Sequence, residues 1–184
     1  MNHFRLRTFA VLAVYLTLAA CGNGIESNGA ARIDGRVDST MSHMFAQHPA
    51  TQQLAANSYG MLVMPLVTEA GMGFGAGFGH GALLINEKPV DYYAAATASA
   101  GFQIGAQQFS HVLFFMTREA LNRFRASKGW ALGADAEYTI LQRSDNVRAD
   151  TTTTLSPVVA VIFAQAGLKV GAALEGIKYT RIIP

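Results

Sequence analysis

Basic side chains gather on one predicted helix, where they could bind phosphate or another anion. Arg118 and Arg125 lie seven residues apart, which places both on one helical face. Guanidinium groups bind phosphate oxygens through paired hydrogen bonds, so such a face suits lipid headgroups. A solvated helix surface is the alternative explanation of the same cluster. Together with basic residues of two polar loops, the candidate headgroup-binding residues are Lys88, Arg118, Arg123, Arg125, Lys128, Arg143 and Arg148.

Two motifs that could hold a nucleotide or a metal are disfavoured by their context. Residues 71–76 fit the dinucleotide fingerprint G-x-G-x-x-G/A, but the glycines continue at period two and no predicted helix follows to receive a pyrophosphate. A zinc site needs clustered ligands, whereas His43, His48, His80 and His111 are dispersed along the chain. We therefore expect no cofactor, no metal and no nucleotide.

Hydrolytic chemistry has little support in the sequence. A Ser–His–Asp triad is recognised by geometry, and no serine lies in a pattern typical of a nucleophile elbow. Asp135 and Glu137 alternate on one predicted strand face and could form a carboxylate site, but a solvated strand edge is the favoured explanation. The chain is expected not to be an enzyme.

Cys21 is the only cysteine in the chain and follows a segment typical of a signal peptide. Within residues 1–20, Arg5 and Arg7 precede an apolar run that is too short to span a bilayer. The sequence Leu-Ala-Ala-Cys-Gly that ends there resembles the lipobox of bacterial lipoproteins. The resemblance implies cleavage before Cys21 and acylation of its sulfur, for example with palmitate. Gly22 favours the outer membrane by the same resemblance, with the domain facing the periplasm or the cell surface. An ordinary secretory signal with a stray cysteine is the alternative.

The length of the chain predicts one domain of ordinary size, and its charge predicts no overall positive field around that domain. The chain has 14 basic and 12 acidic side chains, and Arg5 and Arg7 leave with the signal, so the remaining 164 residues are balanced. Nucleic-acid binding is therefore disfavoured, and an anionic partner must meet a local patch. Residues 21–36 are expected to comprise the lipidated cysteine and a flexible, glycine-rich tether, and residues 37–184 the folded domain.

Apolar periodicity predicts three helices. Val37, Met41, Met44 and Phe45 form one stripe of a helix that Asp38 or Ser39 could cap. A short second helix with Leu54 and Ala55 is expected after Pro49. The third helix, 118–127, is expected to begin at a Thr117 cap and to bury Ala120, Leu121 and Phe124.

The remaining pattern has the period of strands and an unusual number of glycines. Glycines alternate with larger residues over 71–82, and related alternation recurs at 101–107, 129–138 and 167–175. Buried strands are predicted at 61–64, stopped by Pro65, at 112–116 and at 158–163, and polar loops at 86–91 and 142–157. Strand glycines need a reason, which is either strong curvature or helices lying close on the bare face. The predicted fold class is α+β, a small antiparallel β-barrel-like core with about three helices packed on its surface.

The chain resembles the SYLF domain family of lipid-binding proteins over roughly residues 37–184. The segments that carry the resemblance are 60–65, 70–81, 83–84, 92–93, 99–107, 119–121, 129–130, 133–135 and 167–176. The resemblance implies a β-barrel-like core with surface helices, and binding to phosphoinositides or other anionic lipids. Eukaryotic relatives add an SH3 module and act on actin. This chain has no room for an SH3 domain, so the actin role is not carried over.

These observations predict a lipoprotein of the cell envelope whose domain weakly binds anionic lipid headgroups without catalysis. Its expected partners are anionic membrane lipids. One alternative is a structural or protein-interaction module that binds another envelope protein. A small membrane-spanning barrel is a further alternative, which the lipobox and the helical stretches disfavour.

Overall fold

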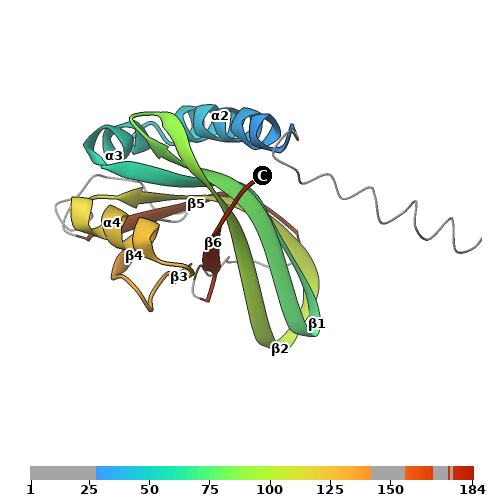
Figure 1. Cartoon of the computed structure of the whole chain (residues 1–184). Coiled ribbons are helices and arrows are strands. Elements are labelled where there is room, and N and C mark those ends of the chain that lie inside the picture. Colours follow the sequence, from blue (N-terminus) through green and yellow to red (C-terminus); the bar gives the residue numbers. More distant parts are fainter. Residues whose placement is uncertain (1–27, 142–155, 168–173, 175) are drawn as a thin grey trace, which may run out of the picture.

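The computed structural model describes residues 28–141, 156–167, 174 and 176–184. Its elements in chain order are α2 (Gly29–Gln47), α3 (Thr51–Asn57), β1 (Gly60–Ile85), β2 (Lys88–Phe115), α4 (Arg118–Ala126), β3 (Trp130–Ala131), β4 (Tyr138–Leu141), β5 (Val158–Gly167) and β6 (Lys178–Ile182). The predicted α+β class with a curled, barrel-like sheet and surface helices is confirmed (Figure 1). Cys21, Arg143 and Arg148, most of the alternation at 167–175 and most of the loop at 142–157 lie outside the described residues.

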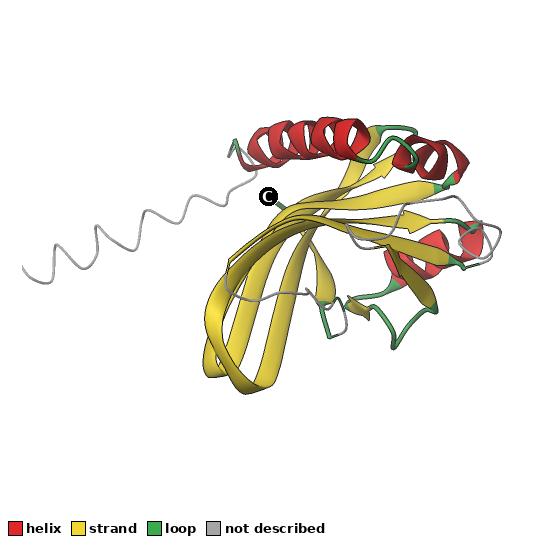
Figure 2. Cartoon of the chain, turned by 180° about the vertical axis from the view of Figure 1, so that it is seen from behind, coloured by secondary structure: helices red, strands yellow, loops and turns green. Residues whose placement is uncertain are grey.

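One long antiparallel hairpin organises the sheet. β1 and β2 pair from Gly60 opposite Phe115 to Ile85 opposite Lys88, and the other edge of β2 is shared between two strands. β5 pairs with the C-terminal half of β2, and β6 pairs with residues 92–96 of its N-terminal half. β3 pairs with the free edge of β6, and β4 pairs in parallel with β5, so the described residues form a six-stranded sheet. Figure 2 shows this sheet curling around its own inner side.

The glycines of β1 let the strand bend back on itself. A Cβ atom on Gly81 would overlap the carbonyl oxygen of Val63, and one on Gly79 would lie 2.5 Å from the carbonyl oxygen of Leu66. The second half of β1 therefore lies against its first half at a distance that no side chain permits. Of the two reasons expected for strand glycines, curvature explains these positions. The atoms nearest to a Cβ on Gly79 or Gly81 belong to the first half of β1 and not to a helix.

The sheet separates two apolar cores. The inner core, inside the curl, includes Phe109, Phe115 and Trp130, together with Leu121 and Phe124 of α4. The outer core lies between the other face of the sheet and the pair α2 and α3; its members include Val37, Met41, Met44, Leu54, Val63, Leu84 and Phe114. Figures 1 and 2 accordingly show α2 and α3 across one face and α4 on the opposite side. The predicted apolar stripes of all three helices are confirmed.

The first helix begins earlier than the sequence pattern indicated. α2 starts at Gly29, so residues 29–36, which were expected to be tether, are helical, and Ile33 is already buried. The predicted cap is wrong, because Ser39 instead donates to the Gly35 carbonyl oxygen at 2.8 Å within the helix. Tyr92 of β2 donates to Asp34 at 3.0 Å, which holds this first part of α2 against the sheet. A sequence window that started at Val37 missed these eight residues, about two helical turns.

Three predicted strand and loop boundaries are corrected. Pro65 does not end the first strand; the register shifts between Met64 and Val67, and this irregularity accommodates a residue without an N–H. The loop expected at 86–91 is a tight turn at 86–87, after which β2 begins at Lys88. The alternation at 129–138 is not one strand, because β3 ends at Ala131 and the chain turns.

The third helix matches its prediction closely. Thr117 caps α4 by accepting a hydrogen bond from the Ala120 N–H at 3.1 Å. Ala120, Leu121 and Phe124 are buried as expected, and the C-cap is Ser127. Among the helices that the structure describes, none combines the length and hydropathy needed to cross a membrane.

Candidate functional site

The basic side chains of α4 point away from the inner core. Because the helix buries one stripe of apolar residues, its other positions face solvent, and Arg118, Arg123 and Arg125 are all exposed. Arg123 and Arg125 lie in the last turn, where the helix dipole favours positive charge. Lys128 follows the C-cap and is also exposed. Four of the predicted headgroup-binding residues are therefore brought together on one side of the domain.

β6 adds two basic residues that sequence reasoning missed. Arg125 contacts Asp91 at 3.2 Å, and Arg181 of β6 contacts the other oxygen of the same carboxylate at 3.5 Å. The Lys178 side chain passes over Gly129, the residue that follows Lys128. A Cβ atom on Gly129 would overlap the Cε atom of Lys178. No simple sequence signal identifies these two basic residues, because the burial of 178–182 does not alternate regularly around Tyr179.

We call this region the α4–β6 basic surface. Its basic residues are Arg118, Arg123, Arg125, Lys128, Lys178 and Arg181, and its acidic residues are Asp91 and Glu119. Six positive charges thus face two negative ones. Asp91 neutralises part of the field because it lies between two guanidinium groups with its side chain only 15% exposed. The Arg123–Glu119 pair, at 3.9 Å and exposed, contributes little to stability.

Arg118 of this surface also packs against an aromatic ring, and the predicted residue Lys88 lies at the margin of the surface. The guanidinium of Arg118 lies 5.2 Å from the ring centre of Tyr59, a cation–π contact that fixes its direction while leaving its N–H groups available. Lys88, the candidate from the first loop, follows the turn at 86–87 and pairs with Ile85. Its side chain is exposed. Ile85 packs partly against the inner core, so Lys88 belongs to the side of the sheet that carries α4.

A buried histidine–tyrosine pair lies inside the curl near this surface. His111 Nε2 and the Tyr179 hydroxyl are 2.8 Å apart, and both residues are fully buried. Burial lowers the pKa of His111 from 6.5 to about 3, and burial raises the pKa of Tyr179. Among the described residues, His111 Nδ1 and the Tyr93 hydroxyl have no hydrogen-bond partner. The pair is therefore neutral at physiological pH and packs within an aromatic core.

The remaining chemical motifs have structural explanations. The fingerprint at 71–76 lies within β1, and no helix follows it, as the nucleotide interpretation would require. Asp135 accepts a hydrogen bond from the Ala131 N–H at 2.7 Å and closes a turn, so it does not share a strand face with Glu137. His80 is exposed and stacks edge-on against Phe78. No group of three or more metal-ligating side chains occurs in the described parts of the chain.

A comparison with protein families finds a match in the C-terminal half of the chain. Residues 96–181 match the Ysc84 family, described as "Las17-binding protein actin regulator". This segment is similar to the Ysc84 (SYLF) domain. The match runs from the middle of β2 into β6, so it includes α4, Lys178 and Arg181, and stops short of α2, α3 and β1. The predicted resemblance to the SYLF family is thereby confirmed, and the family supports a lipid- or actin-related binding module. No curated protein matches the chain.

Proposed function

We propose that this protein is a lipoprotein of the cell envelope whose SYLF domain weakly binds anionic lipid headgroups, without catalysis. The observation that carries the proposal is the α4–β6 basic surface, where six basic residues meet two acidic ones. Phosphate groups of phosphoinositides or of other anionic lipids are the ligands that exposed guanidinium and ammonium groups favour. The candidate contacts are Arg118, Arg123, Arg125, Lys128, Lys178 and Arg181, with Lys88 at the margin.

The same geometry explains why the affinity would be low. Asp91 already occupies Arg125 and Arg181, so a phosphate must compete with a carboxylate for both guanidinium groups. An acyl chain on Cys21 would supply the membrane attachment that the domain lacks. Tethering raises the effective concentration of headgroups, so weak contacts would be sufficient to orient the domain or to bridge to a second membrane. The outer membrane, with the domain in the periplasm or at the cell surface, is the proposed location.

Vesicle binding tests this function directly. Residues 21–184 with Cys21→Ser lack both the predicted signal and the acyl anchor, and their cosedimentation is measured with vesicles of neutral lipid and of the same lipid plus an anionic lipid. We expect binding to the anionic vesicles alone, and a clear decline between 50 and 300 mM salt (about 14 Å to 6 Å of screening length) because the contacts are exposed. Equal binding to both kinds of vesicle would contradict the proposal.

Binding to another protein of the envelope is the second candidate function. It is favoured by the description of the matching family, whose name refers to Las17 binding and actin regulation. Affinity capture with the Cys21→Ser chain, followed by a binding measurement with the purified partner, separates the two functions. A single saturable partner together with no response to anionic vesicles would favour the protein-binding function.

A further inference from the structure

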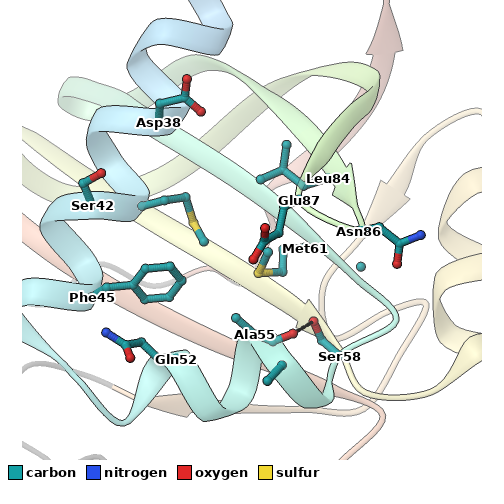
Figure 3. A pocket seen from close by; sticks show the side chains of 13 residues that line it. Asp38, Ser42, Phe45, Gln52, Ala55, Ser58, Met61, Leu84, Asn86 and Glu87 are labelled. Carbon is teal, nitrogen blue, oxygen red and sulfur yellow. Dashed lines mark hydrogen bonds between the residues drawn. The ribbon is translucent and has the colours of Figure 1, made fainter.

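A groove opens on the side of the sheet opposite to the α4–β6 basic surface. It lies between α2, α3 and the ends of β1, with a cavity volume of about 830 Å³ (Figure 3). Its floor is apolar and belongs to the outer core; Met41 and Met61 are 9% and 5% exposed. The lining residues that matter for binding are Asp38, Met41, Ser42, Met61 and Glu87. The volume and the mixture of an apolar floor with a few polar groups are typical of binding sites.

Among the residues that the structure describes, the charged groups that line the groove are all carboxylates. Asp38 comes from α2 and Glu87 from the turn between β1 and β2, so they reach the groove from two separate elements (Figure 3). Both side chains are exposed, and neither has an ion-pair partner within the described part of the chain. A ligand with a negative charge would meet both carboxylates in this groove. The chemistry of the rim therefore favours positive charge beside an apolar group.

The backbone of the turn holds Glu87 in an unfavourable conformation. Asn86 and Glu87 have φ values of 50° and 64°, and both positions of this two-residue turn need the left-handed region. Asparagine tolerates that region, but at the second position glycine is the favoured residue. Local folding alone would thus select glycine at position 87. The glutamate that occupies it brings a carboxylate to the groove.

We infer that the groove binds a peptide segment of another protein that presents apolar side chains between lysine or arginine residues. Two carboxylates on different elements flank the apolar floor, and a basic–apolar peptide supplies two cations and the apolar group between them. An amine lipid headgroup supplies one cation. The thioethers of Met41 and Met61 are flexible and polarisable, which suits side chains of varied shape. This inference does not depend on headgroup binding, because the two regions lie on opposite sides of the sheet.

Calorimetric titration of the full chain with a defined peptide tests the inference. The probe is an amidated peptide that repeats Lys-Leu-Phe-Lys twice, and two controls replace either every lysine with glutamate or every apolar residue with serine. We expect saturable one-to-one binding of the first peptide alone. Asp38→Asn combined with Glu87→Gln should weaken binding about fivefold to tenfold, since each exposed charge contact is worth a few fold.

Two substitutions on α2 provide a matched steric control. Ser42→Trp places an indole in the groove, whereas Ser39→Trp adds the same side chain to an exposed position of the same helix outside the groove. Binding should be lost in the first variant and retained in the second, with equal helix content by circular dichroism. Circular dichroism also shows whether each variant is folded before its affinity is compared.

Three results would overturn the inference. The first is the absence of saturable binding up to millimolar peptide, and the second is equal binding of the acidic control peptide. The third is displacement of the basic peptide by vesicles of phosphatidylethanolamine, which would assign the groove to an amine headgroup. None of these results bears on the anionic vesicle assay, so the two proposals can fail separately.

Discussion

The groove and the α4–β6 basic surface have opposite charge on opposite sides of one sheet. The groove has two carboxylates above an apolar floor, and the basic surface has six positive charges against two negative ones. Beyond the predicted signal, the chain has equal numbers of basic and acidic side chains. A balanced total therefore conceals two regions of opposite charge. For this protein, the distribution of charge is informative about function where its sum is not.

Both regions depend on the bend of β1, and the largest expected effect comes from blocking it. Gly81→Ala would push a methyl group into the Val63 carbonyl oxygen and against the Met64 sulfur. Because the obstacle is backbone, we expect a loss of about 3 kcal/mol or more in the free energy of unfolding. Chemical denaturation measures it, and binding at both regions should decline together.

Gly35→Ala is the matched control for that substitution. Gly35 lies within α2 and a Cβ there meets nothing within 4 Å, so alanine should stabilise the protein by about 0.5–1 kcal/mol. Equal stability of the two variants would show that the approach of the two halves of β1 is not tight.

Acid should destabilise the inner core beneath the basic surface. The pKa of His111 falls from 6.5 to about 3 on folding, so below pH 6.5 the unfolded chain binds a proton that the folded chain does not. The stability is complete above pH 6.5 and declines as the pH falls, by up to about 1.4 kcal/mol per unit. We expect a loss of about 2 kcal/mol at pH 5, measured by urea denaturation.

A paired substitution identifies the source of that pH dependence. His111→Leu combined with Tyr179→Phe removes the titrating group together with its hydrogen-bond partner, so no buried hydroxyl is left unsatisfied. The pH slope between 7.5 and 5 should become shallower by about one proton. An unchanged slope would assign the effect to other groups.

Charge substitutions on the basic surface should alter vesicle binding in both directions. Arg125→Gln with Lys128→Gln removes two exposed cations and should weaken binding to anionic vesicles about tenfold. Asp91→Asn frees Arg125 and Arg181 and should strengthen it by about twofold to fivefold. Cosedimentation measures both. Peptide binding in the groove should not change, and weaker vesicle binding by the Asp91 variant would argue against this surface.

The smallest effect is expected at the turn that supplies Glu87. Glu87→Gly relieves the left-handed strain and should stabilise the protein by up to about 1 kcal/mol, while it weakens peptide binding. Thermal unfolding and calorimetry give the two quantities. A variant that is more stable and binds the peptide as tightly as before would separate Glu87 from the groove's function.

Local patterns were sufficient for the buried faces of the helices and for four of the six basic residues of the α4–β6 basic surface. The stripe of Met41 and Met44, the Thr117 cap and the inward Phe124 depend on residues within two turns of each other, so periodicity and capping chemistry identify them. The basic residues of α4 were visible for the same reason. The predicted end of the first strand at Pro65 was wrong because a bulge in the pairing with β2 accommodates this proline.

The other features depend on contacts between residues that are distant in sequence. The alternating glycines could mean curvature or helix contact, and only the position of Val63 against Gly81 distinguishes the two. Arg181 joins Arg125 through Asp91 across 90 residues of sequence, and Asp38 faces the same groove as Glu87 although the two belong to separate elements. No window of sequence contains such neighbours, because sheet register and the bend of β1 bring them together. Composition and spacing thus determined which side chains were available, and the curl of the sheet determined which of them share a surface.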